Sequence, residues 1–176
     1  MKIKTIIIAG ILLLIINKGI SQHLTYNELL ILQNSSVEKC EEILNKKGFV
    51  LSDTKYDEDS KETSINWKYK NVNNEYFTKT CSNLFSNNCT EIFYMTNNEL
   101  SISTIKNNMK AGFNKFVYTD TNSKGVLSHH YLINAFKSLE ITYPREVVFY
   151  TFPTSISEKK LFAIKIHKID IKIVEE

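Results

Sequence analysis

The three cysteines of this 176-residue chain carry its most direct covalent chemistry. Cys81 and Cys89 flank a segment that we predict to be a hairpin loop, so their side chains would meet across adjacent strands. In an oxidising compartment they are the candidates for a structural disulfide, which would stabilise the fold by ~2.5 kcal/mol. A bridge from Cys40 to one of them, or two unlinked thiols, are the alternatives. Their spacing differs from zinc sites, where about two to four residues separate paired ligands.

The histidines are the next candidates for chemistry, and they are His23, His129, His130 and His167. His129 and His130 are neighbours in a predicted strand, so they point to opposite faces and cannot bind one metal ion together. A Cys–His nucleophile built on Cys40 would need an exposed thiol, but this residue lies on the apolar side of a predicted helix. No G-x-S-x-G motif positions a serine. We therefore predict no catalytic residues and no metal site.

Cofactor and ion loops are missing from the sequence pattern. After residue 21 the only glycines are Gly48, Gly112 and Gly125, which are too far apart for a phosphate-binding loop. The acidic run Asp57-Glu58-Asp59 lacks the spacing of a calcium loop, so we interpret it as an exposed turn. The sequence therefore predicts no cofactor.

Aromatic residues on predicted strands are the more suggestive group. They are Trp67, Tyr69, Tyr76, Tyr94, Tyr131, Tyr143 and Tyr150. We expect most of them in the core, but several on one exposed face would form a binding platform, since Tyr and Trp are rigid anchors. The sequence does not assign the faces, because a register shift of one residue inverts them.

Residues 1–21 have the layout of a secretory signal peptide. Lys2 and Lys4 precede an apolar run from 6 to 16, and Gly19-Ile20-Ser21 supplies small residues for cleavage. This run of 11 residues is too short to cross a bilayer, which takes ~20 residues. No later segment is long and apolar enough either. We predict cleavage after Ser21 and a periplasmic or secreted protein without a transmembrane segment.

The basic excess of the chain belongs to this signal. The formal net charge is +3, from 22 Lys+Arg and 19 Asp+Glu. Residues 1–21 contain three lysines and no acidic residue, so the other 155 residues carry 19 basic and 19 acidic side chains. Arg145 is the only arginine, and the lysines are scattered among acids. This distribution argues against nucleic acid as a partner.

Helices followed by strands are predicted before residue 96. Thr25–Glu28 and Ser35–Glu38 read as capping boxes that begin two helices, and Gly48 is a natural stop for the second. Ile65, Trp67 and Tyr69 alternate with polar residues, which indicates a half-buried strand. Short turns between such strands favour antiparallel pairing.

The same order begins again at Thr96, where Thr96–Glu99 reads as a third capping box. Lys46-Lys47-Gly48-Phe49 is matched by Lys110-Ala111-Gly112-Phe113, 64 residues later. Strands are then predicted over 116–119, 127–133, 139–143, 147–152 and 161–166. We therefore predict an α+β protein of two tandem units (22–95 and 96–176), packed as one body. Each unit would be a helix packed on an antiparallel sheet of about four strands.

Three segments carry a resemblance: Leu24–Gln33, Lys46–Phe49 and Ile65–Lys70, which follow a signal ending in Ser-Gln. In these the chain resembles small uncharacterised exported proteins of Bacteroidetes-type bacteria. The duplicated order is similar to the tandem architecture of the β-lactamase inhibitor protein family. The first resemblance names no activity, and the second concerns architecture, which does not imply function.

Export, aromatic strands and the lack of a catalytic motif lead to one functional expectation. We expect a non-catalytic binding or interaction module whose partner is a protein or an envelope glycan. The alternatives are an envelope-directed hydrolase built from dispersed residues such as His129 and His130, and a structural envelope component. The sequence leaves the oligomeric state open.

Overall fold

The fold was analysed in a computed structural model, which describes residues 23–70, 75–82, 89–110, 114–133, 145–154 and 160–168. The predicted signal peptide, Gly112 and the predicted strand 139–143 lie outside these residues. Three helices are described: α2 (Tyr26–Asn34), α3 (Val37–Lys46) and α4 (Glu99–Lys110).

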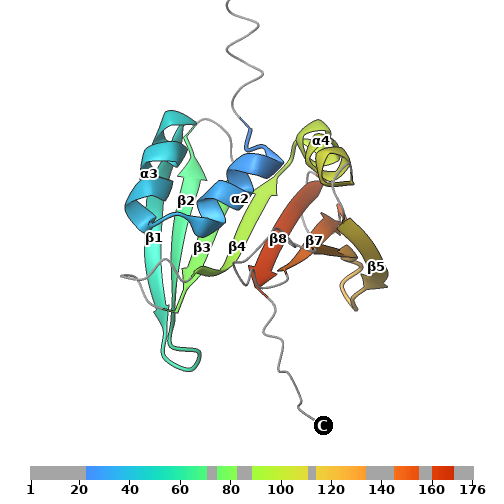
Figure 1. Cartoon of the computed structure of the whole chain (residues 1–176). Coiled ribbons are helices and arrows are strands. Elements are labelled where there is room, and N and C mark those ends of the chain that lie inside the picture. Colours follow the sequence, from blue (N-terminus) through green and yellow to red (C-terminus); the bar gives the residue numbers. More distant parts are fainter. Residues whose placement is uncertain are drawn as a thin grey trace, which may run out of the picture.

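The described strands form one antiparallel sheet (Figure 1). They are β1 (Phe49–Asp57), β2 (Glu62–Tyr69), β3 (Tyr76–Cys81), β4 (Cys89–Thr96), β5 (Asn114–Thr121), β6 (Leu127–Ile133), β7 (Arg145–Phe152) and β8 (Leu161–Lys168). Their order across the sheet is β1-β2-β3-β4-β8-β7-β6-β5. The last strand therefore lies in the middle, beside β4.

This topology corrects the predicted fold class. Two units with separate four-stranded sheets were expected, whereas the structure has a single eight-stranded sheet. The sheet is continuous because β4 pairs with β8 over six residue pairs, from Glu91↔His167 to Thr96↔Phe162. An unpaired strand edge leaves a row of backbone donors and acceptors without partners, and this pairing satisfies both inner edges at once. The internal duplication of the sequence stays a prediction.

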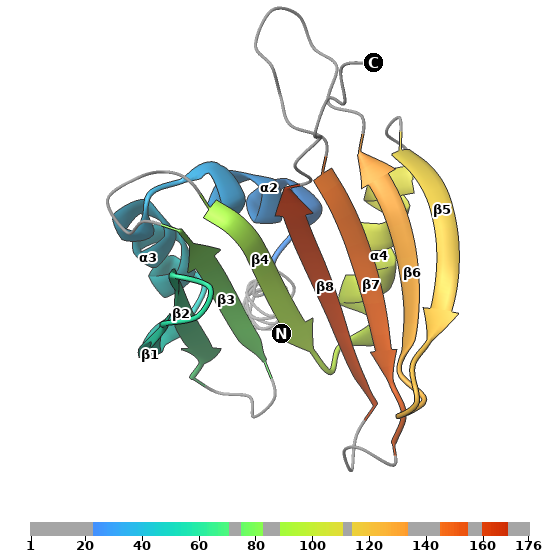
Figure 2. The same ribbon diagram turned by 90° about the horizontal axis from the view of Figure 1, so that it is seen from below.

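All three described helices lie on one face of the sheet, as the view from below shows (Figure 2). Helix α3 packs on β1, α2 on β4 and α4 on β8. The core between helices and sheet is formed by buried side chains that alternate along the strands, such as Ile65, Trp67, Phe77, Tyr94, Phe149 and Ile164. The alternation predicted for Ile65, Trp67 and Tyr69 is confirmed.

The helix ends agree with the sequence only in part. The capping box at Thr25 is confirmed, since its side chain accepts from Glu28 N–H and Glu28 accepts from the Thr25 N–H. The second and third helices begin later than predicted, with Ser36 and Asn98 as the residues that cap them. Gly48 follows α3 with a φ of +91°, which confirms it as the stop.

Within the described ranges, each helix is too short or too polar to cross a bilayer.

Candidate functional site

The face of the sheet opposite α2, α3 and α4, here called the outer face, carries most of the polar chemistry. Strand alternation assigns residues to it. Tyr131 of β6 and Phe149 of β7 belong to the core, so their neighbours His130, Val148 and Tyr150 point outward. The register then brings together on this face residues from β4, β8, β7 and β6.

A chain of hydrogen-bonding side chains crosses this face. Ser128 Oγ lies 3.1 Å from His130 Nε2, and His130 Nδ1 lies 2.5 Å from Glu146 Oε1. The other oxygen of Glu146 lies 3.0 Å from His167 Nε2. We call these four residues the histidine chain. The aromatic ring of Tyr118 stacks on His130, with centroids 4.0 Å apart.

The neighbouring histidines His129 and His130 point to opposite faces of the sheet, as expected. His129 contacts Thr119, whereas His130 contacts Glu146. His130 and His167 lie on one face and share the Glu146 carboxylate, one oxygen each. Among the residues that the structure describes, no three His, Cys, Asp or Glu side chains are arranged to hold a metal ion.

Serine, histidine and carboxylate in this order are the groups of a hydrolase triad. The distances fit hydrogen bonds, but the Ser128 residue is only 8% exposed. Both Ser128 and His130 come from one strand, two residues apart, so the strand alone sets their separation. The arrangement can move a proton between Ser128 and His130, while Glu146 orients the imidazole.

Beside the histidine chain, three aromatic rings form a row on the outer face. Phe93 of β4 lies 6.4 Å from Tyr150 of β7, and Tyr150 lies 6.2 Å from Phe152. Strand β8 runs between β4 and β7, and its residue beside Tyr150 is the fully buried Ala163. Phe93 lies beside Lys165 of β8, so the two rings approach each other diagonally over this strand. The Lys165–Glu91 ion pair, at 2.5 Å, borders this row.

The aromatic residues singled out in the sequence fall on both faces. Trp67, Tyr69, Tyr94 and Tyr131 are buried in the core. Tyr76 and Tyr150 are half-buried, and Tyr143 lies outside the described residues. Partial burial raises the pKa of Tyr150, so its hydroxyl stays protonated and can donate a hydrogen bond to a ligand.

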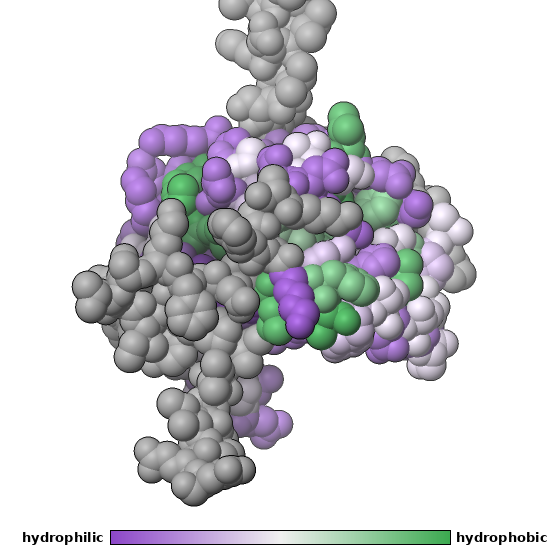
Figure 3. All heavy atoms as spheres, turned by 45° about the vertical axis from the view of Figure 1, so that its right-hand side comes forward, coloured by the Kyte–Doolittle hydropathy of each residue, from purple (hydrophilic) through white to green (hydrophobic). Residues whose placement is uncertain are grey.

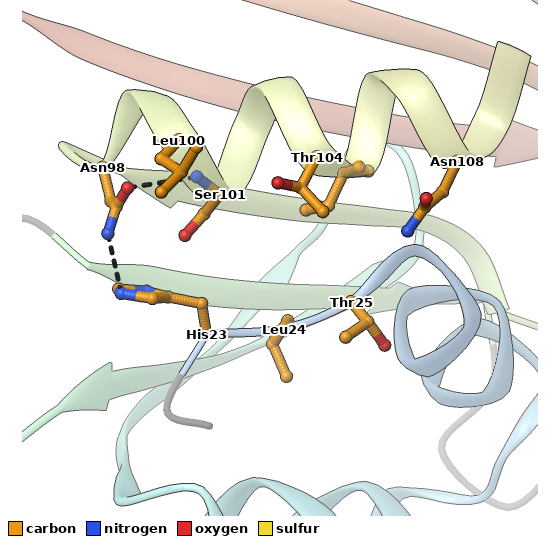
Figure 4. Close-up of a pocket in the computed structure, with 9 residues that line it drawn as sticks. His23, Leu24, Thr25, Asn98, Leu100, Ser101, Thr104 and Asn108 are labelled. Carbon is orange, nitrogen blue, oxygen red and sulfur yellow. Dashed lines mark hydrogen bonds between the residues drawn. The ribbon is translucent and has the colours of Figure 1, made fainter. Parts of the chain in front are cut away.

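A separate pocket of about 270 Å³ lies between α4 and the segment His23–Thr25 (Figure 4). Polar side chains of α4 line one side, among them Ser101, Thr104 and Asn108. Asn98 Nδ2 lies 2.8 Å from His23 Nε2, which joins the two sides. Its volume is slightly below that of usual ligand sites, which are ~300 Å³ or more.

A buried carboxylate, that of Glu75, contacts the pocket residue His23. Glu75 is 1% exposed, and its Oε1 lies 3.2 Å from His23 Nδ1 and accepts a 2.5 Å hydrogen bond from the Tyr94 hydroxyl. Burial, with the nearby Glu75 charge, holds the pKa of Tyr94 well above its usual range. These contacts attach the first described residues to the core, so we interpret the network as structural.

Cys81 and Cys89 are cross-strand partners in β3 and β4, so they lie on adjacent strands as expected. Both are buried, and no disulfide links the cysteines of the described residues. A hydrogen bond with Cys81, together with burial, raises the pKa of the Cys89 thiol. Cys40 is buried as predicted, and its thiol donates to the Leu32 carbonyl at 3.2 Å. The disulfide itself stays a prediction.

Comparison with known proteins found no similar protein. No protein-family model, curated protein or solved structure matches the chain. The resemblances stated from the sequence therefore stay predictions, and the candidate site rests on its own geometry.

Several residues of the outer face were not singled out in the sequence, among them Ser128, Glu146, Phe93 and Tyr118. Ser128 could have been found from the pattern Ser-x-His within one strand, because residues two apart share a face. Glu146 and Phe93 had no such local signal. They join the site through strands that lie far apart in the chain, and only the register brings them together.

Proposed function

We propose that the protein is an exported, non-catalytic binding module whose outer face holds a protein or an envelope glycan. One observation carries this proposal: the row Phe93–Tyr150–Phe152 on a face bordered by the Lys165–Glu91 ion pair and the histidine chain. Half-buried aromatic rings supply contact area with little loss of side-chain entropy. The surrounding charged and polar groups supply hydrogen bonds at the rim.

Export is part of the proposal and rests on residues 1–21 of the sequence. A module of this kind would act in the periplasm or outside the cell. Tyr150 combines an apolar ring with a polar hydroxyl, so it can contact both an apolar and a hydrogen-bonding part of a ligand.

A pull-down with a matched pair of variants tests this function. The double variant Phe93→Ser, Tyr150→Ser removes the aromatic row, whereas Tyr56→Ser removes a tyrosine that is 60% exposed at the edge of β1. We expect wild type and Tyr56→Ser to retain the same envelope protein or insoluble glycan, and the double variant to retain at least about tenfold less. Circular dichroism checks that all three are folded. Equal retention by all three, or no partner at all, would contradict the proposal.

A hydrolase acting on envelope material is the second candidate, favoured by the Ser128–His130–Glu146 geometry. A fluorophosphonate probe, which reacts with activated serines, tests it directly. Labelling of Ser128 that disappears in His130→Ala would support this candidate. An unlabelled Ser128 in the folded protein would exclude a serine mechanism at this site.

A further inference from the structure

Strand β5 ends the sheet on one side with three consecutive exposed apolar residues. Phe116 is 50%, Val117 44% and Tyr118 48% exposed. Figure 2 shows β5 at the margin of the sheet, with β6 beside it on one side only. Apolar side chains also reach the surface among hydrophilic ones on the side of the molecule that comes forward in Figure 3. An edge strand of this kind is a template for a further strand.

The opposite edge of the sheet differs in character. Strand β1 carries Asp53, Lys55 and Asp57 in its C-terminal half. The Lys55 ammonium lies 3.3 Å from the Asp53 carboxylate. Charges along an edge discourage the addition of another strand. Exposed apolar residues of β1, Leu51 and Tyr56, are thus separated by charged ones, whereas those of β5 are consecutive.

A bulge in β5 places its two charged side chains on the same face. The register shifts between Phe116 and Tyr118. As a result Lys115 lies beside Leu132 and Asp120 beside Ser128, and both of these β6 residues point to the outer face. Without the bulge, residues five apart would point to opposite faces. Lys115 and Asp120 are both exposed.

We propose that two copies of this chain associate through β5, antiparallel and around a two-fold axis. In the register where Phe116 faces Thr119 of the second copy, Lys115 of each copy lies opposite Asp120 of the other. The strand is thus complementary to itself in charge, as a symmetric interface requires. Val117 and Tyr118 meet at the centre and exclude water there.

The backbone agrees with this register. Asn122 N–H donates to the Val126 carbonyl at 3.2 Å, within its own hairpin. Alternate residues of an antiparallel strand direct their backbone groups to opposite sides, so Thr119 directs its N–H and C=O to the edge. Thr119 is also the residue that faces Phe116 in the proposed dimer. One added strand pair is a small interface, so the dimer is expected to be weak and concentration-dependent.

Charge reversal combined with sedimentation equilibrium tests the dimer. Lys115→Glu and Asp120→Lys each place like charges opposite each other twice, so we expect each to raise the dissociation constant at least about tenfold. An equimolar mixture of the two variants restores opposite charges, and it is expected to form a heterodimer about as tight as the wild-type dimer. Lys55→Glu, at the other edge, is the matched control and leaves dimerisation unchanged.

Three results would overturn the proposal. The first is a wild-type protein that stays monomeric up to about 1 mM, in which case a strand of a different protein would be the candidate to pair with β5. The second is a dimer that neither reversal weakens, and the third is a pair of weakened variants that do not recover on mixing. Circular dichroism on each variant distinguishes a lost interface from a lost fold.

Discussion

At the scale of single residues, the buried hydrogen bond between Tyr94 and Glu75 invites a direct measurement. Tyr94→Phe removes the hydroxyl that donates to Glu75 Oε1 and leaves a buried carboxylate with one partner fewer. We expect the free energy of unfolding to fall by about 1–3 kcal/mol, as measured by urea denaturation. Tyr56→Phe, at an exposed position, is expected to change it by less than about 0.5 kcal/mol. Equal effects would contradict a stabilising role for the bond.

The cysteines give a second prediction at this scale. After export to an oxidising compartment, we expect peptide mapping of non-reduced protein to find Cys81 linked to Cys89, because they face each other across β3 and β4. Cys40 should remain a thiol and react slowly with iodoacetamide, since burial raises its pKa and little thiolate forms near pH 7. Cys81 and Cys89 both alkylated as thiols, or a bridge to Cys40, would refute the pairing.

Residue types and periodicity were enough to predict much at this scale. The alternation of Ile65, Trp67 and Tyr69 assigned their face correctly. The adjacency of His129 and His130 predicted that their side chains lie on opposite faces of the sheet. Glu146 could not be found in this way, because its partners His130 and His167 come from two other strands. Strand register is a property of the assembled sheet and leaves no mark on the local pattern.

At the scale of elements, the end of α2 depends on a buried lysine. Lys79 of β3 is 1% exposed, and its ammonium donates to the carbonyls of Leu32, Gln33 and Ser35 at 2.5–3.3 Å. The three donors of the ammonium group thus match three carbonyls at the end of α2, where the helix supplies no further backbone donors. This positive charge also lies at the negative end of the helix dipole.

Lys79→Met tests this capping role. The Gln33 and Ser35 carbonyls lose this donor and the Leu32 carbonyl keeps only the Cys40 thiol, so we expect the free energy of unfolding to fall by about 2 kcal/mol or more, with faster hydrogen exchange at the end of α2. Lys55→Met, whose side chain is 74% exposed, serves as the control and should have little effect. If Lys79→Met leaves the free energy of unfolding unchanged, the lost hydrogen bonds are offset by no longer having to bury a charged group.

Helix α3 gives a prediction on pH. Hydrogen bonds from Lys39 and Lys46 lower the pKa of Glu42 from 4.5 to about 2. A carboxyl whose folded pKa is depressed contributes stability above its unfolded pKa, and this contribution is lost as the pH falls from about 4.5 towards 2. We expect an NMR titration to place Glu42 below the other exposed carboxyls of the chain. A Glu42 pKa near 4.5 would show that solvent screens both pairs.

At the scale of the whole molecule, the join of β4 to β8 predicts a single cooperative unfolding. Ile164 of β8 is 1% exposed and faces Tyr94 of β4. Ile164→Ala is expected to lower the stability by about 2–5 kcal/mol. Trp67 on β2, the only tryptophan, should report the same shift as circular dichroism does. Leu51→Ala, at a position 51% exposed, is the control.

Two transitions, with Trp67 unaffected by the change on β8, would show that the halves unfold independently. The sequence could not reveal this join. Alternation identifies which face of a strand is buried. The sequence patterns of β4 and β8, however, do not indicate which strand lies beside either of them. Their pairing is decided by the edges that remain once the local hairpins have formed.

The central place of the last strand has a consequence for how the chain reaches its native state. Glu91 and His167 are neighbours in the sheet although most of the second half separates them in the sequence. Contacts between distant residues close late and slow folding. During synthesis the first four strands emerge early, and the edge of β4 that pairs with β8 stays unpaired until β8 has been made. The period before β8 arrives is the time when the nascent chain is most open to misassembly with its neighbours, and a chaperone that shields strand edges would act then.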